Sequence, residues 1–276
     1  HPSFCDRGIC RIEHHTTIAD ERHERHQINM AKIVILGSSN AVAHKDHENT
    51  HLVITGQERV VLVDCPGNPI LRLERAGVDF NAVTDLIVTH FHPDHVSGGP
   101  LFIMDMWLLG RTRPLEVYGL PYTLDRLENM MGLYNWDKWP GIYPVSFTRL
   151  PATEMSPVLD CPDFKIFSSP VQHLIPTIGL RVEFPSQKVF AYSCDTEPCE
   201  EVTQLATGAD VLVHEASGLF RGHSSATQVG EIAAQAEVGQ LYLIHYLNGT
   251  LDLVAEAQSR YSGQVSLAED FTTLEF

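Results

Sequence analysis

Short runs of apolar, often β-branched residues alternate with polar segments along most of this chain. Their length and flanking turn residues predict buried strands at 31–36, 51–55, 59–64, 85–89, 115–119, 164–168, 179–184, 188–193, 209–214 and 240–245. Apolar residues at helical spacing predict helices at 69–76, 95–109, 121–133, 198–207, 225–237 and 251–261. Early strands follow one another closely and later strands alternate with helices. The pattern therefore predicts two β-sheets packed face to face, with helices outside.

The first 29 residues break this pattern, because they hold few apolar positions but five of the fifteen histidines. We predict a polar, flexible N-terminal extension over 1–29 and a single domain over 30–276. The extension contains possible metal ligands, but it has too few apolar residues to hold a site, so a mobile tail is the favoured interpretation. These possible ligands are Cys5, Cys10, His14 and His15.

Composition excludes some classes of protein. The 276 residues carry a formal net charge of −16, which repels polyanions and argues against extended nucleic acid as a partner. No stretch of 18 apolar residues occurs, so we expect no membrane span. The six cysteines are scattered through a chain with ample core, which predicts free thiols. Without a secretory signal at its start, the chain is expected to be cytoplasmic.

The candidate chemistry begins where the predicted strand 85–89 ends, in the sequence Thr-His-Phe-His-Pro-Asp-His. His90 and His92 are two residues apart, so on an extended strand end their imidazoles project to the same face. Asp94 and His95 follow where the chain turns into a helix. Three imidazoles and one carboxylate this close together suit zinc or a similar ion, and two metals would explain the density of donors. The alternative is a polar turn with accidental histidines.

This cluster resembles the signature of the metallo-β-lactamase superfamily. Asp64, His173, Asp195 and His245 each follow an apolar strand and extend the resemblance over most of the domain. The resemblance implies an α/β fold, a four-layer αββα sandwich of two mixed β-sheets flanked by helices. It implies two divalent metal ions, zinc with manganese or iron as alternatives. One ion would take His90, His92 and His173, the other Asp94, His95 and His245, with Asp195 bridging and Asp64 structural.

Two further motifs narrow the resemblance to the ribonuclease Z group. They are His-Glu-Ala-Ser at 214–217 and Gly-His-Ser-Ser-Ala at 222–226, and Leu-Gly-Ser-Ser-Asn-Ala at 36–41 agrees with them. The resemblance implies that His223 acts on the scissile phosphate and that Glu215 orients it. With Asp94, these residues form the expected catalytic set. Ser224 or Ser225 also fits an N-cap of helix 225–237, and His214 is read as structural.

One departure from the ribonuclease Z pattern bears on the substrate. The segment after residue 121 is short and aromatic, where transfer-RNA processing members carry a long basic arm. We therefore expect a small-molecule or short phosphodiester substrate, hydrolysed by a binuclear metal-dependent enzyme that the resemblance suggests is a homodimer. Alternatives are hydrolysis of a lactone, thioester, sulfate ester or lactam, transfer-RNA 3′ processing, and a non-catalytic metal-occupied binding protein. The aromatic loop 134–143 could be a lid, a dimer contact or a cover for a core edge.

Overall fold

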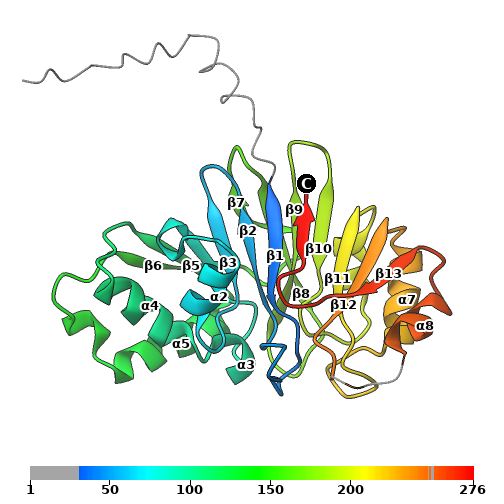
Figure 1. Cartoon of the computed structure of the whole chain (residues 1–276), viewed down its shortest axis with the longest axis horizontal. Helices are drawn as coiled ribbons and strands as arrows, with labels where there is room; N and C mark the ends of the chain where they lie inside the picture. Colours follow the sequence, from blue (N-terminus) through cyan, green and yellow to red (C-terminus); the bar gives the residue numbers. More distant parts are fainter. Residues whose placement is uncertain (1–30, 248, 250–251) are drawn as a thin grey trace, which may run out of the picture.

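The computed structural model describes residues 31–247, 249 and 252–276. The predicted extension over 1–29, with its possible ligands, lies outside the described residues. Within them, two mixed β-sheets pack face to face and helices cover both outer faces (Figure 1). The predicted four-layer αββα sandwich is confirmed.

Each sheet combines antiparallel and parallel pairing. The described part of the first sheet has the order β14 (Thr273–Glu275), β1 (Lys32–Gly37), β2 (His51–Thr55), β3 (Val60–Val63), β4 (Asp85–Ile87), β5 (Leu115–Gly119), β6 (Val145–Arg149). The second has the order β13 (Gln264–Leu267), β12 (Gln240–Ile244), β11 (Val211–Glu215), β10 (Val189–Tyr192), β9 (Thr177–Glu183), β8 (Lys165–Val171), β7 (Ser156–Asp160). Strands β3–β6 are mutually parallel, and so are β10–β13.

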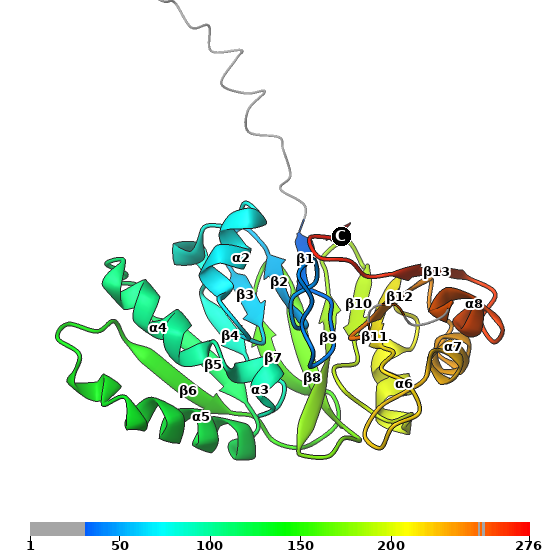
Figure 2. The same ribbon diagram turned by 60° about the horizontal axis from the view of Figure 1, so that its bottom comes forward.

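The helices divide between the two outer faces (Figure 2). One group follows strands of the first sheet: α2 (Pro69–Arg75), α3 (Pro93–Val96), α4 (Gly99–Leu108) and α5 (Pro121–Leu133), with short 3-10 turns η2 (Phe80–Ala82) and η3 (Trp136–Lys138). The other follows strands of the second: α6 (Glu200–Ala206), α7 (Ala226–Gln235) and α8 (Leu253–Gln258). Among the described residues, no helix has the length and apolarity that a membrane span requires.

Strand β1 shows why apolar residues occupy nearly every position of the central strands. Ile33 and Ile35 face the second sheet, whereas Val34 and Leu36 belong to the core beneath the helices. A strand covered on both faces needs apolar residues at successive positions. A third core lies between the second sheet and α6–α8. These three cores fix the strand ends that carry the polar side chains described below.

The sequence missed four strands: β6, β7, β13 and β14. Each stands at or next to the edge of a sheet and is short, with few apolar residues, so its pattern is weak. The predicted helix 95–109 is also wrong as one element, because it divides into α3 and α4 at Ser97 and Gly98. The helix predicted at 121–133 has the bounds observed for α5.

Gly98 permits the close approach at this break. A Cβ at Gly98 would lie 2.5 Å from the Gly67 oxygen and 2.8 Å from the Cys65 oxygen. We therefore expect Gly98→Ala to lower the free energy of unfolding, measured by urea denaturation, by about 1–3 kcal/mol. Gly132→Ala is the matched control, because open space surrounds that helical glycine and a gain of up to about 1 kcal/mol is expected. Equal stability of the two variants would contradict this packing argument.

The aromatic loop 134–143 covers a core edge. The Trp139 ring stacks on Trp107 at 5.1 Å between centroids, and Tyr143 donates a hydrogen bond to the Ile103 carbonyl. The loop leads into β6, which runs parallel to β5, so it lies at the edge where these strands begin. The metal-ligand candidates lie at the opposite edge. The lid interpretation is therefore wrong.

The described cysteines are Cys65, Cys161, Cys194 and Cys199, and all four are free. The prediction of free thiols is confirmed for them, whereas Cys5 and Cys10 lie outside the described residues. Burial raises the pKa of the Cys65 and Cys194 thiols well above their usual range. These two buried thiols are therefore protonated and inert at neutral pH.

Candidate metal centre

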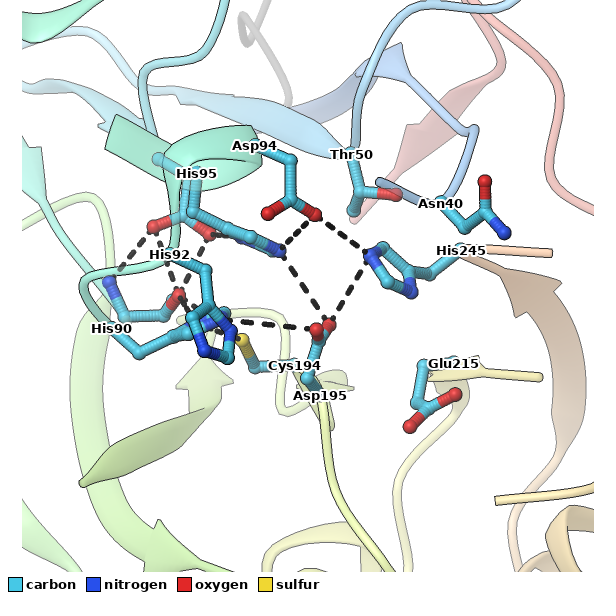
Figure 3. A network of polar contacts seen from close by, with 12 residues as sticks. Asn40, Thr50, His90, His92, Asp94, His95, Cys194, Asp195, Glu215 and His245 are labelled. Atoms are coloured by element: carbon cyan, nitrogen blue, oxygen red, sulfur yellow. Dashed lines mark hydrogen bonds and ion pairs between the residues drawn. The ribbon is translucent and has the colours of Figure 1, made fainter. Parts of the chain in front are cut away.

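Strand direction gathers the candidate residues at one edge of the sandwich. β3 and β4 are parallel, and they are followed by Asp64 and by the cluster that begins at His90. In the other sheet β9 runs antiparallel to both β8 and β10, so these two point the same way as β11 and β12. His173, Asp195 and His245 follow β8, β10 and β12. Donors far apart in sequence thus meet where the two sheets face each other (Figure 3).

The first group of donors consists of His90, His92, His173 and Asp195. His92 Nδ1 lies 3.1 Å from His90 Nε2 and 3.1 Å from His173 Nε2. Asp195 Oδ2 lies 3.8 Å from both of those Nε2 atoms. Tetrahedral ligands about 2.05 Å from zinc stand about 3.3 Å apart, so these spacings fit a zinc-sized ion.

The second group consists of Asp94, His95, His245 and again Asp195. Asp94 Oδ2 lies 3.5 Å from His95 Nε2 and 3.4 Å from His245 Nε2. Asp195 Oδ1 lies 3.6 Å from each of the same two nitrogens. One carboxylate therefore turns one oxygen toward each group, which is the geometry of a bridging ligand (Figure 3).

Asp64 and Thr89 determine which nitrogen two of these histidines present. The Thr89 hydroxyl donates to Asp64, so it accepts from the Nδ1–H of His90, 3.1 Å away. The Nδ1–H of His95 donates directly to Asp64 Oδ2 at 2.7 Å. Both imidazoles then direct Nε2 into their donor groups, and this is the nitrogen that would bind a metal ion. Asp64 thus has the structural role that the sequence predicted.

His173 and His245 are oriented in the same way by other partners. The Nδ1–H of His173 donates to the Gly222 carbonyl at 2.6 Å. The Nδ1–H of His245 donates to the Ser217 hydroxyl at 2.8 Å, and that hydroxyl donates to the His245 carbonyl. Only His92 differs among the donor histidines, because its Nδ1 faces the group. Each imidazole therefore has one nitrogen directed into a donor group.

The residues present fit a cation. His95 Nε2 and Asp195 Oδ1 are buried without a hydrogen-bond partner among the described residues, and a positive ion between them would satisfy both. Burial lowers the pKa of His90 well below its usual range, which keeps the imidazole neutral. Burial alone would raise the pKa of Asp195, but the imidazoles of His245 and His95 hold it well below its usual range. Burial alone would lower the pKa of His95, but Asp195 and Asp64 raise it well above its usual range, so a metal ion would have to displace a proton from that imidazole.

His223 and Glu215 stand beside both groups. His223 Nδ1 lies 2.9 Å from Glu215 Oε1, and the His223 ring is 5.0 Å from that of His173 and 5.8 Å from that of His245. Burial by itself would lower the pKa of His223. The hydrogen bond to Glu215 and the charges of nearby carboxylates together have the larger, opposite effect, so the pKa is raised overall. The pair that the sequence singled out is therefore assembled next to the donors, with the imidazole inclined toward the protonated form.

Backbone donors hold Glu215 itself in place. Oε1 accepts from the N–H groups of Thr196 and Ser224 at 3.1 and 3.2 Å, and Oε2 accepts from Ser217 at 2.8 Å. Glu215 is completely buried. A carboxylate with this many donors stays fixed in position, which suits a residue that orients an imidazole.

The predicted N-cap of the next helix is Ser225, whose side chain forms a capping box with Gln228 at the start of α7. Ser224 instead donates to the Thr196 carbonyl. His214 is buried and its Nδ1 contacts the Glu215 carbonyl, which agrees with the structural reading.

A family model described as "Anti-Pycsar protein Apyc1" matches residues 31–270, which is most of the described chain. The chain belongs to this family. A ribonuclease Z of Methanothermobacter thermautotrophicus is 26% identical, over 89% of this chain and 97% of the relative. The resemblance to the ribonuclease Z group is thereby confirmed.

Solved structures agree with the fold. The metallo-β-lactamase fold protein YhfI from Bacillus subtilis superposes with a TM-score of 0.77 at 19% identity, covering 89% of this chain and 99% of that one. The human short-form tRNase Z gives a TM-score of 0.70 at 21% identity, with 88% and 98% covered. At these identities, the two structures establish the shared architecture.

In this member of the Anti-Pycsar protein Apyc1 family, three residues that orient the imidazoles could not be assigned that role from the sequence. Thr89, Ser217 and Gly222 each lie within one of the sequence motifs, but the motifs indicate no orienting role for them. Thr89 could have been suspected, because it directly precedes His90 and its hydroxyl can reach a neighbouring ring. Nothing in the sequence marks Gly222 or Ser217 as a partner, because their contacts span 49 and 28 residues.

Proposed function

We propose that this chain is a binuclear metal-dependent phosphodiesterase. The observation that carries the proposal is the pair of donor groups sharing Asp195, with His223 and Glu215 assembled beside them. The relatives named ribonuclease Z support a phosphodiester as the bond that is cleaved. The nitrogen and oxygen donors and their spacing favour two zinc ions, and manganese or iron fit the same donors.

The ligand assignment is part of the proposal. The first ion would be held by His90, His92 and His173, and the second by Asp94, His95 and His245, with Asp195 bridging. When bound, the two ions supply Lewis-acid stabilisation of phosphoryl charge and an activated water. The protein holds the donors rigidly, since most of them stand just beyond strand ends packed in the inter-sheet core.

The remaining chemistry falls to His223 and Glu215, which lie outside the ligand set, and to Asp94, which lies within it. His223, protonated and fixed by Glu215, donates a proton to the leaving oxygen as the ester bond breaks. Burial by itself would raise the pKa of Asp94. Contacts with His245 and His95 together have the larger, opposite effect, so the pKa is lowered overall and the residue stays a carboxylate. We assign Asp94 to orienting the attacking water as well as to binding metal.

A small-molecule or short diester is the substrate that the surroundings favour. Between β5 and β6 the described chain forms α5, η3 and the aromatic loop, with no inserted basic arm. The net charge of −16 disfavours a long polyanion. A homodimer and a cytoplasmic location remain proposals that rest on the ribonuclease Z resemblance and on the free thiols.

A substrate panel tests the function. Purified protein with zinc or manganese would be assayed on bis(p-nitrophenyl) phosphate, p-nitrophenyl phosphate, an aryl sulfate, a lactone, a thioester and a transfer-RNA precursor. We expect turnover of the diester at least about tenfold faster than of any other compound. Preference for the sulfate, lactone or thioester would replace phosphodiester cleavage with that activity. Efficient, salt-sensitive cleavage of the RNA would instead show that no arm is needed.

A further inference from the structure

The loop after β10 carries a second acidic residue, Glu197, which the proposed chemistry does not use. Its Oε1 accepts a hydrogen bond from the Gly222 N–H at 2.7 Å. Its own N–H donates to the Gln172 carbonyl at 2.7 Å, and the Gln172 side-chain amide donates to Oε2 at 3.4 Å. Glu197 therefore joins three loops, and these loops carry Asp195, His173 and His223.

Gly222 links Glu197 to the donor residue His173. Its carbonyl accepts from His173 Nδ1 at 2.6 Å, while its N–H is held by Glu197. Its φ is +85°, and a Cβ there would lie 2.9 Å from both His173 Nδ1 and Leu174 Cγ. Only glycine permits this approach. The direction of the His173 ring is therefore set by the position of the Gly222 backbone.

The same backbone position controls His223. A turn runs from Phe220 to His223, closed by a hydrogen bond from the His223 N–H to the Phe220 carbonyl at 3.0 Å. Gly222 is the residue before His223 in this turn. Any shift of Gly222 would move His223 relative to Glu215 and rotate His173 away from its donor group.

We propose that Glu197 is a positioning residue that couples the metal ligand His173 to the proton donor His223 through the backbone of Gly222. The coupling to His223 rests on the proposed function, and the coupling to His173 does not. Glu197 has no ion pair among the described residues, so its carboxylate is free to serve as a hydrogen-bond acceptor. A carboxylate bound to a backbone N–H gives a stronger bond than a neutral acceptor.

Three substitutions and one control test this coupling. Glu197→Ala removes the acceptor, Glu197→Asp keeps the charge but shortens the reach, and Glu197→Gln keeps a carbonyl oxygen at the same distance. Glu200→Ala is the control, because among the described residues the hydrogen-bond partner of this exposed carboxylate is Gln204 of its own helix. Thermal unfolding of each variant would show which ones fold. If Glu197→Ala does not fold, the more conservative Glu197→Asp is used in its place.

Two readouts distinguish positioning from a merely structural role. Titration of the metal-free protein with Co²⁺ should show affinity about 10–100-fold weaker in Glu197→Ala, and within about threefold of wild type in Glu197→Gln. The kcat of Glu197→Ala should fall about tenfold more for an alkyl ester than for the p-nitrophenyl ester, because only the alkoxide needs a proton to leave. KM should change little.

The outcomes separate the two ideas. A Glu197→Ala protein that matches Glu200→Ala in Co²⁺ affinity and in leaving-group dependence would overturn the coupling. A wild-type protein inactive on every diester, whose Co²⁺ affinity still falls in Glu197→Ala, would overturn the proposed function and support the link to His173. Equal loss of kcat for both esters would overturn the link to His223.

Discussion

Replacing Asp195 with alanine is expected to abolish activity, with a loss of at least about 10³-fold, or about 4 kcal/mol of transition-state stabilisation. Among the described residues, Asp195 is the one carboxylate that faces both donor groups, 3.8 Å from the first pair of nitrogens and 3.6 Å from the second. If the proposed assignment holds, its removal takes a ligand from both ions at once. Elemental analysis after dialysis should therefore show less metal than in wild type, together with the loss of diesterase activity.

Asp160→Ala is the matched control, because this exposed carboxylate lies on the edge strand β7 and, among the described residues, forms an ion pair with Lys165 alone. It should keep full metal content and activity. His92→Ala extends the test to a residue of the first group alone, and partial metal loss is expected. Retention of all metal by both Asp195→Ala and His92→Ala would refute the ligand assignment.

The second large effect is expected for His223→Ala, through the leaving group and not through the metals. Positioned proton donors contribute about 10²–10⁴-fold, and we expect a loss in this range for an alkyl diester. A p-nitrophenolate leaves without a proton, so the loss for the aryl diester should be much smaller. Metal content should match wild type, because His223 belongs to neither shared donor group.

Chemical rescue is the control for His223. Added imidazole should restore part of the alkyl diesterase activity of His223→Ala, because the lost side chain leaves space beside the donor groups. The same imidazole should leave Asp195→Ala inactive. Equal losses on the alkyl and aryl esters would assign His223 to stabilising phosphate charge and would exclude proton donation.

Much of the architecture could be predicted because burial on both faces of a sheet leaves a strong signal. Strands such as β1 and β2 are covered on both sides, and their apolar runs were found within a residue or two. The edge strands β6 and β7 were missed because exposed positions dilute the pattern, and Pro157 interrupts β7. Of the interpretations left open for the aromatic loop, the lid could not be eliminated from the sequence because β6, the strand that fixes where the loop lies, was itself missed.

The candidate donors could also be found from the sequence, because each follows a strand that is itself recognisable. His90, His92, Asp94 and His95 lie within six residues, and their spacing alone predicts a shared face. Grouping them with His173, Asp195 and His245 needed the family resemblance. The structure adds that the donor atoms of each group lie within 4.8 Å of one another, and that Asp195 belongs to both groups.

The sequence by itself therefore determined the layers of the sandwich and the cluster of donors at 90–95. The family resemblance added the donors that follow the later strands. Only the tertiary structure decided which nitrogen each histidine presents, and that Glu197 and Gly222 tie His173 to His223. The physical reason is the range of each interaction. Burial acts on every residue of a strand, so it leaves a recognisable pattern of apolar residues in the sequence. An orienting hydrogen bond joins two atoms from distant segments, so it leaves no such pattern.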